Sequence, residues 1–170
     1  MPDIFRPVLR TLPLAGLLGL ALVLTACEPG VDEADLQALQ AEVEDRFTPG
    51  LHTLMVDMGM RHASLWFAGD AGNWPLADYM IHELEELVEE IEELHPVYHE
   101  VPVAELLSEM TTPAIERLEA AVDAGDGPAF REAYDQLTNA CNACHIAADR
   151  DAIVMQRPTH PPFTNLRYRP

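Results

Sequence analysis

Apolar residues recur at intervals of three and four along most of this chain, which is the spacing of one face of an α-helix. In residues 51–68, for example, Leu54, Met58 and Leu65 lie on one stripe. No stretch of alternating apolar and polar residues long enough for a strand occurs before residue 152. The pattern predicts helices over residues 32–46, 51–68, 73–94, 103–124 and 128–148.

The last four of these helices follow one another with short connections, which predicts an all-α, antiparallel four-helix bundle over residues 50–150. The weaker helix that precedes them is expected to be a spacer. Pro113 leaves open whether the third bundle helix is continuous or split into two pieces. Residues 151–170 are rich in proline, and we expect an irregular tail there that packs on the bundle.

Residues 1–26 have the pattern of an export signal. Two arginines precede an apolar run of 15 residues, Leu12 to Ala26, which is shorter than the roughly 20 residues of a membrane span. The run ends in Leu-Thr-Ala-Cys, which resembles the lipobox at which bacterial lipoproteins are cleaved and acylated. We therefore expect a lipid on Cys27, residues 27–49 as anchor and spacer, and a membrane-anchored lipoprotein in the bacterial periplasm. The alternative is ordinary signal cleavage beside an incidental cysteine, and the choice between inner and outer membrane stays open.

The chain is strongly acidic, with 29 Asp+Glu against 10 Lys+Arg and a net charge of −19 over 170 residues. All ten basic residues are arginines, and removal of residues 1–26, with Arg6, Arg10 and Asp3, makes the charge −20. This balance argues against binding to nucleic acid or to anionic lipid. Six glutamates in residues 85–93 form either a solvated helix face or a docking surface for a basic redox partner. The acidity also suits a protein that works in high salt.

One motif carries specific chemistry: Cys141-Asn142-Ala143-Cys144-His145 matches the attachment pattern of c-type haem. Residues three apart on a helix share a face, so both thiols can add to the vinyl groups of one porphyrin while His145 binds its iron. Cys27 is then left for lipid, and all three cysteines are used. The alternatives are a redox thiol pair, a zinc site and a structural disulfide. A redox pair normally opens a helix after a strand, and further zinc ligands at finger-like spacing are not evident.

A helical bundle with this motif late in its last helix resembles the cytochrome c-prime superfamily. The resemblance extends over residues 51–170. Within the superfamily, the chain looks like a periplasmic group of mostly uncharacterised c-prime-like haem proteins. The segments that carry this likeness are Arg61–Gly69, Gly72–Ala77, Ala133–His145 and Gln156–Asn165. It implies one covalent haem c with His145 as the proximal iron ligand, and it allows a homodimer and the binding of gases. The tail is a departure, because the better-known c-prime cytochromes lack it.

The sequence leaves several candidates for the sixth ligand of the iron. In an up-down-up-down bundle the end of the last helix lies near the start of the first, so the iron is expected to face residues 51–66. Met55, Met58 and His62 share the apolar face there. Met55 matches the depth of His145 and is the favoured distal ligand. His62 is the second candidate, or a partner of a haem propionate, and Met58 is the third. The remaining alternative is an open site, with the methionines as core residues. The other histidines are expected on the surface or in loops: His52, His82, His95, His99 and His160.

The expected function is therefore that of an exported, lipid-anchored mono-haem c-type cytochrome, which transfers single electrons and is not an enzyme. A second possibility is a gas-binding or gas-sensing haem protein for NO or CO, which requires an open or displaceable sixth site. A third is a non-redox binding module in which the haem is structural.

Overall fold

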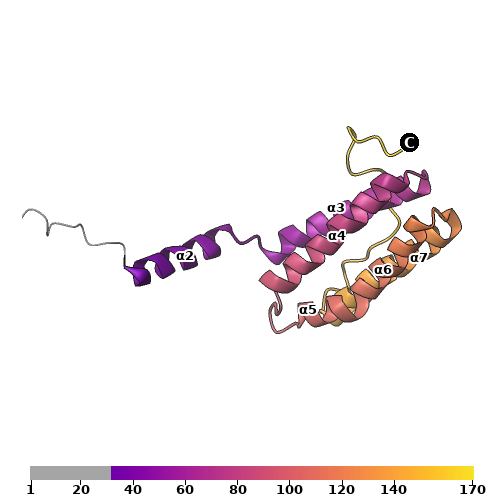
Figure 1. Ribbon diagram of the computed structural model, residues 1–170. Helices are drawn as coiled ribbons and strands as arrows, with labels where there is room; N and C mark the ends of the chain where they lie inside the picture. The colour runs from indigo at the N-terminus through magenta and orange to yellow at the C-terminus, as the bar shows by residue number, and fades with distance from the viewer. Residues whose placement is uncertain (1–31) are drawn as a thin grey trace, which may run out of the picture. The chain divides into compact units, whose positions relative to one another are not determined.

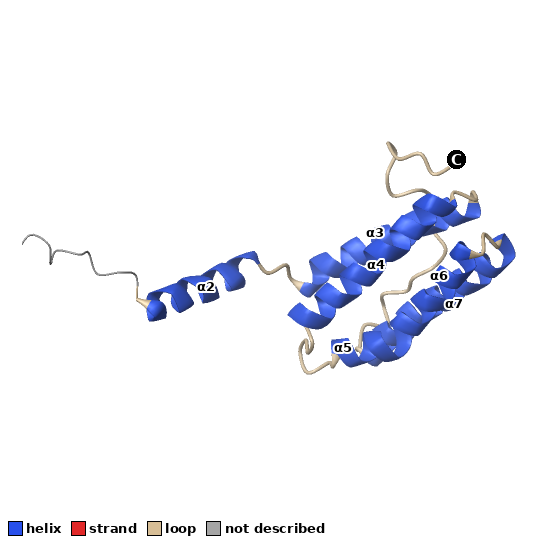
Figure 2. Ribbon diagram, viewed as in Figure 1, coloured by secondary structure: helices blue, strands red, loops and turns tan. Residues whose placement is uncertain are grey.

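The computed structural model describes residues 32–170, so the predicted export signal and Cys27 lie outside the described residues. Every regular element among the described residues is a helix, and none is a strand (Figure 2). The prediction of an all-α protein is confirmed. The elements are α2 (Glu33–Phe47), α3 (Leu51–Asp70), α4 (Trp74–Leu94), α5 (Val103–Leu106), the π-helix η1 (Leu107–Thr111), α6 (Thr112–Asp123) and α7 (Gly127–Ala147).

The chain divides into two compact units, of which the second spans Thr48–Pro170 and contains five packed helices. In this unit α3 packs against α4, α4 against α6, and α6 against α7, and α7 returns to contact α3 (Figure 1). The apolar stripes meet inside this ring of contacts, because burying them removes their carbon atoms from water. The largest fully buried side chains are Tyr134, Phe130, Leu65, Ile81, Ile91, Leu107 and Leu118.

The helix boundaries have local causes in the sequence. Asp126 caps α7, since its side chain accepts a hydrogen bond of 3.0 Å from the backbone N–H of Ala129. Gly72 and Gly125 follow α3 and α6 with φ of 71° and 63°, a left-handed conformation that costs glycine little. Asn73 precedes α4 as expected of a cap, but its side chain makes no capping hydrogen bond.

The third bundle helix is not split at Pro113. Helical backbone runs without a break from Val103 to Asp123, and the π-helix η1 lies directly before the proline. Proline has no N–H to donate to the preceding turn, and a wider π turn accommodates that loss. The carbonyl of Leu107 accepts from the backbone N–H of Thr112 and, at 3.3 Å, from the hydroxyl of the same residue.

Helices α3 and α7 approach closely at Gly69. A Cβ on this residue would overlap the ring of Phe130, which is fully buried. Trp66 and Trp74 flank the same ring at centroid distances of 6.2 and 6.1 Å. This aromatic cluster therefore fixes how α3, α4 and α7 pack at this level.

The proline-rich tail has no regular structure, but side chains hold it to the helices. The guanidinium of Arg157 pairs with Asp135 at 2.6 Å and lies 4.4 Å from the ring centroid of Trp66. Near the end of the chain, the hydroxyl of Tyr168 lies 3.3 Å from the hydroxyl of Ser64, and both residues are buried.

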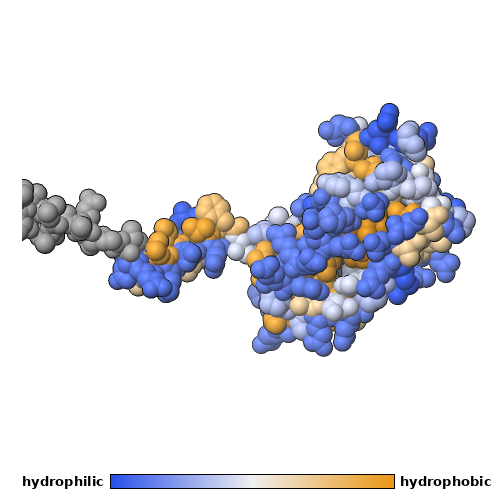
Figure 3. All heavy atoms as spheres, in the orientation of Figure 1, coloured by the Kyte–Doolittle hydropathy of each residue, from blue (hydrophilic) through white to orange (hydrophobic). Residues whose placement is uncertain are grey.

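Helix α2 belongs to the other unit. Its apolar side chains are exposed, with Phe47 73% exposed, and Figure 3 shows apolar atoms gathered along it. This stripe consists of Leu36, Leu39, Val43 and Phe47. Within residues 32–170 no helix combines the length and the apolar character that crossing a membrane requires.

Candidate functional site

A cavity of about 390 Å³ lies where the start of α3 meets the end of α7. The loop between α4 and α5, helix α5 and the tail complete its wall. This volume is within the range of roughly 300–1,000 Å³ that is usual for cofactor and ligand sites. The lining residues are Leu51, His52, Met55, Val56, Gly59, Tyr98, His99, Val101, Val103, Leu106, Cys144, His145, Ala148, Arg150, Ile153 and Met155.

The charges around this cavity differ from those of the chain as a whole. The protein has 29 Asp+Glu, yet none of the described residues that line the cavity is an Asp or a Glu. Arg150 is the one lining residue of the described part that carries a fixed positive charge. The site is therefore mostly apolar and suits a hydrophobic group that carries negative charge at its edge.

His145 has a defined protonation pattern. Its Nδ1 lies 2.9 Å from the backbone carbonyl oxygen of Ile153. A carbonyl oxygen can only accept, so Nδ1 carries the hydrogen, and in the neutral ring the lone pair is on Nε2. The chain reverses after α7 to make this contact, with Asp149 at φ 56° and the N–H of Arg150 donating to the carbonyl of His145 at 2.7 Å. His145 is thus prepared to bind a metal through Nε2.

The two cysteines of the motif are free thiols three residues apart on α7. Cys144 is buried and lines the cavity, whereas Cys141 is partly buried against the core beside it. Burial, with a smaller contribution from Cys144, raises the pKa of Cys141 to about 11, and burial also raises the pKa of Cys144. A catalytic redox pair needs the opposite shift, because the thiolate is the reactive form. The raised pKa values of the two thiols therefore do not favour the alternative of a thiol–disulfide centre.

The three predicted distal residues lie at different depths on α3. Met55 lines the cavity together with His145. Met58 is 9% exposed and belongs to the hydrophobic core. His62 is 3% exposed and is absent from the cavity wall. The structure thus brings Met55 to the site and places the other two inside the helical core.

His62 uses both ring nitrogens within the core. Thr138 donates its hydroxyl hydrogen to the carbonyl of Tyr134 at 2.9 Å, so its oxygen accepts from Nε2–H of His62 at 3.0 Å. The hydroxyl of Tyr134 lies 2.9 Å from Nδ1 of His62 and 3.0 Å from the backbone carbonyl oxygen of the same residue, and these two acceptors share its single hydrogen. Burial lowers the pKa of His62 to about 4. His62 is therefore a neutral structural residue here, with its nitrogens bonded to protein groups.

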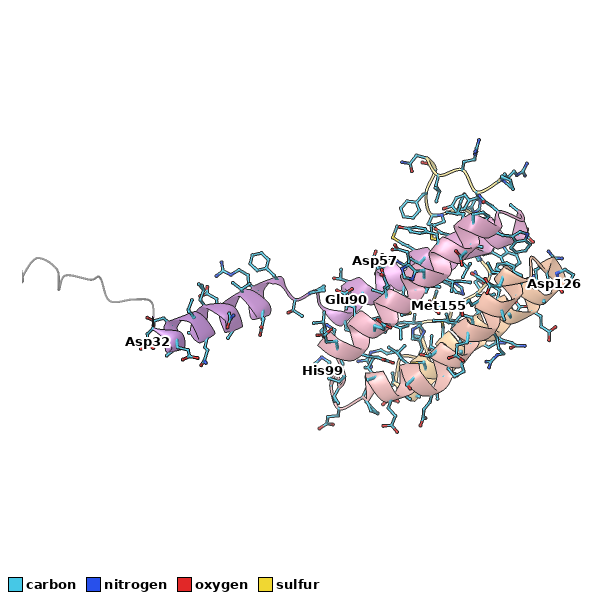
Figure 4. All side chains as sticks on the ribbon, in the orientation of Figure 1. Asp32, Asp57, Glu90, His99, Asp126 and Met155 are labelled. Carbon is cyan, nitrogen blue, oxygen red and sulfur yellow. The ribbon has the colours of Figure 1, made fainter. Side chains whose placement is uncertain are left out.

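Several cavity residues have no clear signal in the sequence. His52 and His99 are exposed, as expected, but both also line the cavity, and Met155 reaches it from the tail. Figure 4 labels His99 and Met155, which come from the α4–α5 loop and from the tail. Loops and tails lack a repeating pattern, so spacing along the chain does not show which of their residues face a site.

A multi-ligand metal site of the zinc type is not found in the part of the chain that the structure describes, since no three His, Cys, Asp or Glu side chains gather there.

Comparisons of the chain with known protein families, with curated proteins and with solved structures find no match. The fold and the cavity therefore define a small all-α protein with a histidine-containing apolar site.

Proposed function

We propose that this protein is a mono-haem c-type cytochrome that transfers single electrons, with the haem held in the cavity between α3 and α7. The observation that carries the proposal is that Cys144 and His145 line one apolar cavity while Nδ1–H of His145 is bonded to the backbone carbonyl of Ile153, which leaves Nε2 free to bind iron. These are two of the three groups that c-type haem attachment requires, and Cys141 lies three residues before Cys144 on the same helix.

The residues present fit this group. A bound haem c supplies a reversible one-electron change at its iron. The apolar wall would exclude water from the porphyrin, and Arg150, which lines the cavity, would supply the positive charge for propionate carboxylates. Because Asp and Glu are missing from the described part of the wall, these carboxylates meet no repulsion there.

We further propose that the second unit is an antiparallel four-helix bundle of the cytochrome c-prime type. The ring of contacts among α3, α4, α6 and α7 supports this topology. So does the meeting of the start of α3 with the end of α7, which an up-down-up-down order requires.

For the sixth ligand we propose Met55, because it is the only one of the three candidates on α3 that lines the cavity with His145, whereas Met58 and His62 are in the core. A thioether ligand raises the reduction potential relative to two histidines. The gas-binding alternative is favoured by a different observation. Val56, Gly59 and Leu106 also line the cavity, and none of these three residues has a side-chain atom that can bind iron. That function needs Met55 to be displaceable.

The remaining parts of the proposal concern location and partner. We propose that acylation at Cys27 anchors the protein in the periplasm and that α2 is part of a spacer. The glutamates of α4 that face solvent, among them Glu86, Glu89, Glu90 and Glu93, support a partner with a basic surface. A rate of electron transfer that falls steeply with added salt is the expected sign of such steering.

Co-expression with a cytochrome c maturation system tests the haem. We expect covalent haem in the wild-type chain and in Cys27→Ser, and none in the double variant Cys141→Ser with Cys144→Ser. The Cys27→Ser variant is the matched control, because it removes a cysteine outside the proposed site. Wild-type protein that carries no covalent haem after maturation overturns the proposal.

Absorption and magnetic circular dichroism spectra test the sixth ligand. We expect a thioether-to-iron charge-transfer band that is lost in Met55→Leu and kept in Met58→Leu. If the wild-type protein instead binds CO or NO readily and lacks this band, gas binding becomes the favoured function. Equal effects of the two substitutions contradict the assignment of Met55.

A further inference from the structure

Three hydrogen bonds join the tail to the last two turns of α7, inside the CxxCH motif itself. Nδ1–H of His145 donates to the carbonyl of Ile153 at 2.9 Å. The side-chain amide of Asn142 donates to the carbonyl of Met155 at 3.0 Å, and it accepts from the N–H of Met155 at 2.7 Å. The Asn142 amide thus bonds both the C=O and the N–H of Met155, and this pair of bonds fixes the orientation of the Met155 backbone as well as its distance from α7.

The carbonyl of Ile153 is held from two directions. On one side, a turn brings the chain back from α7, and the N–H of Ile153 donates to the carbonyl of Arg150 at 2.9 Å. On the other side, Asn142 holds Met155, which is two residues further on. The acceptor that faces His145 is therefore a positioned backbone group rather than the end of a mobile loop.

Such an acceptor has two effects on an imidazole that binds a metal. It selects the tautomer with hydrogen on Nδ1 and fixes the plane of the ring. It also draws the Nδ1–H bond toward the acceptor, which increases the electron donation from Nε2. Greater donation stabilises ferric iron more than ferrous iron, and it therefore lowers the reduction potential.

We propose that Asn142 is a positioning residue: it clamps the tail at Met155 so that the Ile153 carbonyl orients His145 and lowers the reduction potential of the haem. This inference rests on the proposed haem site. It gives a role to a variable position of the attachment motif and to the tail that follows α7.

The test compares Asn142→Ala with Asn139→Ala in the full-length, haem-loaded chain. Asn139 is the matched control, because it is an exposed asparagine about one turn earlier on the same helix. In Asn142→Ala we expect a higher reduction potential, with the ratio of oxidised to reduced protein at a fixed potential falling by up to about tenfold, or about 59 mV. In a Met55→Leu background, where the ferrous iron is expected to be five-coordinate, we also expect Asn142→Ala to lower the iron–histidine stretching frequency in resonance Raman spectra. Asn139→Ala is expected to match the wild type. An unchanged potential and an unchanged stretching frequency in Asn142→Ala overturn the proposal.

A second measurement separates failure of the clamp from failure of the haem proposal. In haem-free protein, nitrogen-15 NMR reports which ring nitrogen of His145 carries hydrogen, and amide exchange reports protection of the Met155 N–H. We expect the Nδ1–H tautomer and a protected amide in the wild type, and loss of both in Asn142→Ala. If the chain proves to bind no haem, this result still decides whether the clamp exists. A wild-type ring with hydrogen on Nε2 contradicts the clamp, whatever the haem content.

Discussion

The rings of His62 and Tyr134 stack at a centroid distance of 4.5 Å, and the Tyr134 hydroxyl lies 2.9 Å from Nδ1 and 3.0 Å from the backbone oxygen of the same histidine. Both side chains are buried between α3 and α7. Two helices are thereby joined through polar groups in the middle of an apolar core. Each of these groups depends on the other, since an unpaired polar atom at this depth is costly.

Substitution of His62 is therefore expected to affect stability rather than iron ligation. In His62→Ala we expect the free energy of unfolding to fall by about 2–4 kcal/mol, because a cavity forms and the Tyr134 hydroxyl loses a partner. Urea titration followed by circular dichroism measures this loss. The absorption spectrum of the haem-loaded variant is expected to be that of the wild type. A change of spin state in His62→Ala contradicts the structural role.

His62 also predicts a dependence of stability on pH. Its pKa is about 4 in the folded protein against an ordinary 6.5. Above pH 6.5 the ring is neutral in both states and the shift has no effect on stability. As the pH falls from there toward 4, the unfolded chain takes up a proton that the folded protein excludes, so stability is lost. We expect the loss attributable to His62 to reach about 3 kcal/mol.

The His62→Gln variant isolates this contribution from that of the carboxylates. The difference in unfolding free energy between wild type and variant is measured by urea titration at several pH values from 7.5 to 4. As the pH falls, the wild type is expected to lose more unfolding free energy than His62→Gln. A difference that stays constant over the range refutes the assignment.

Periodicity predicted the helices because apolar side chains at intervals of three and four must share a buried face. Helix order and depth along the helix favoured Met55 over His62 as the residue near His145, and Met55 and His145 do line one cavity. The sequence did not show that Tyr134 and Thr138 on α7 bond the ring nitrogens of His62, because a single apolar stripe does not reveal the partners of its residues.

The tail shows a different limit of sequence reasoning. Prolines predicted that it is irregular, but its contribution to the site comes from the backbone carbonyl of Ile153 and from the backbone of Met155. Backbone groups are present at every residue, so no residue type marks those that face a ligand. Likewise, the sequence left open whether the helix continues across Pro113, and the structure answers this with a π turn that accommodates the missing N–H without a break.

Gly69 is expected to be intolerant of the smallest side chain. In an open helix, Gly→Ala stabilises by up to about 1 kcal/mol. In Gly69→Ala the new Cβ overlaps the ring of Phe130, which Trp66 and Trp74 flank. We therefore expect a net loss of about 1–3 kcal/mol in unfolding free energy, measured by thermal or urea denaturation.

A matched control lies on the same helix. The nearest atom to a Cβ on Gly59 is Cε of Met155 at 3.9 Å, which is an ordinary contact. We expect Gly59→Ala to keep or slightly raise the stability of the haem-free protein. We expect Gly69→Ala to cost less unfolding free energy in a Phe130→Leu background than in the wild type, because the smaller leucine side chain leaves room for the new Cβ. Equal stability of Gly69→Ala and Gly59→Ala contradicts the close approach.

The thiols of the haem-free protein are expected to react slowly with alkylating agents. With a pKa of about 11, Cys141 is thiolate in about one molecule in a thousand at pH 8. In the Cys144→Ser variant, which leaves Cys141 alone in the motif, we expect alkylation by iodoacetamide to be about a hundredfold slower than in an unfolded control in urea. The rate is expected to rise as the pH approaches 11. Mass spectrometry of timed samples measures it, and fast alkylation of the folded protein at pH 8 disproves the burial of Cys141.

Arg157 is expected to be the main attachment to α7 of the part of the tail that follows Met155. Its guanidinium makes two bonds to the Asp135 carboxylate at 2.6 and 2.7 Å, donates to the carbonyl of Arg131 at 3.3 Å, and stacks on Trp66. The ion pair itself is about half exposed and contributes roughly 0–1 kcal/mol, and the contact with Trp66 contributes about 0.5–1 kcal/mol more. Arg157→Ala is therefore expected to cost about 1–2 kcal/mol and Asp135→Ala less than about 1 kcal/mol. The stability of Arg157→Lys is expected to fall between those of the wild type and Arg157→Ala, because lysine keeps the charge without the planar fork.

Tryptophan fluorescence and protease cleavage within residues 151–170 report the release of the tail. Arg169→Ala, at an exposed position near the end of the chain, is the control. Equal release of the tail in Arg169→Ala and Arg157→Ala contradicts the prediction that the contacts of Arg157 hold the tail.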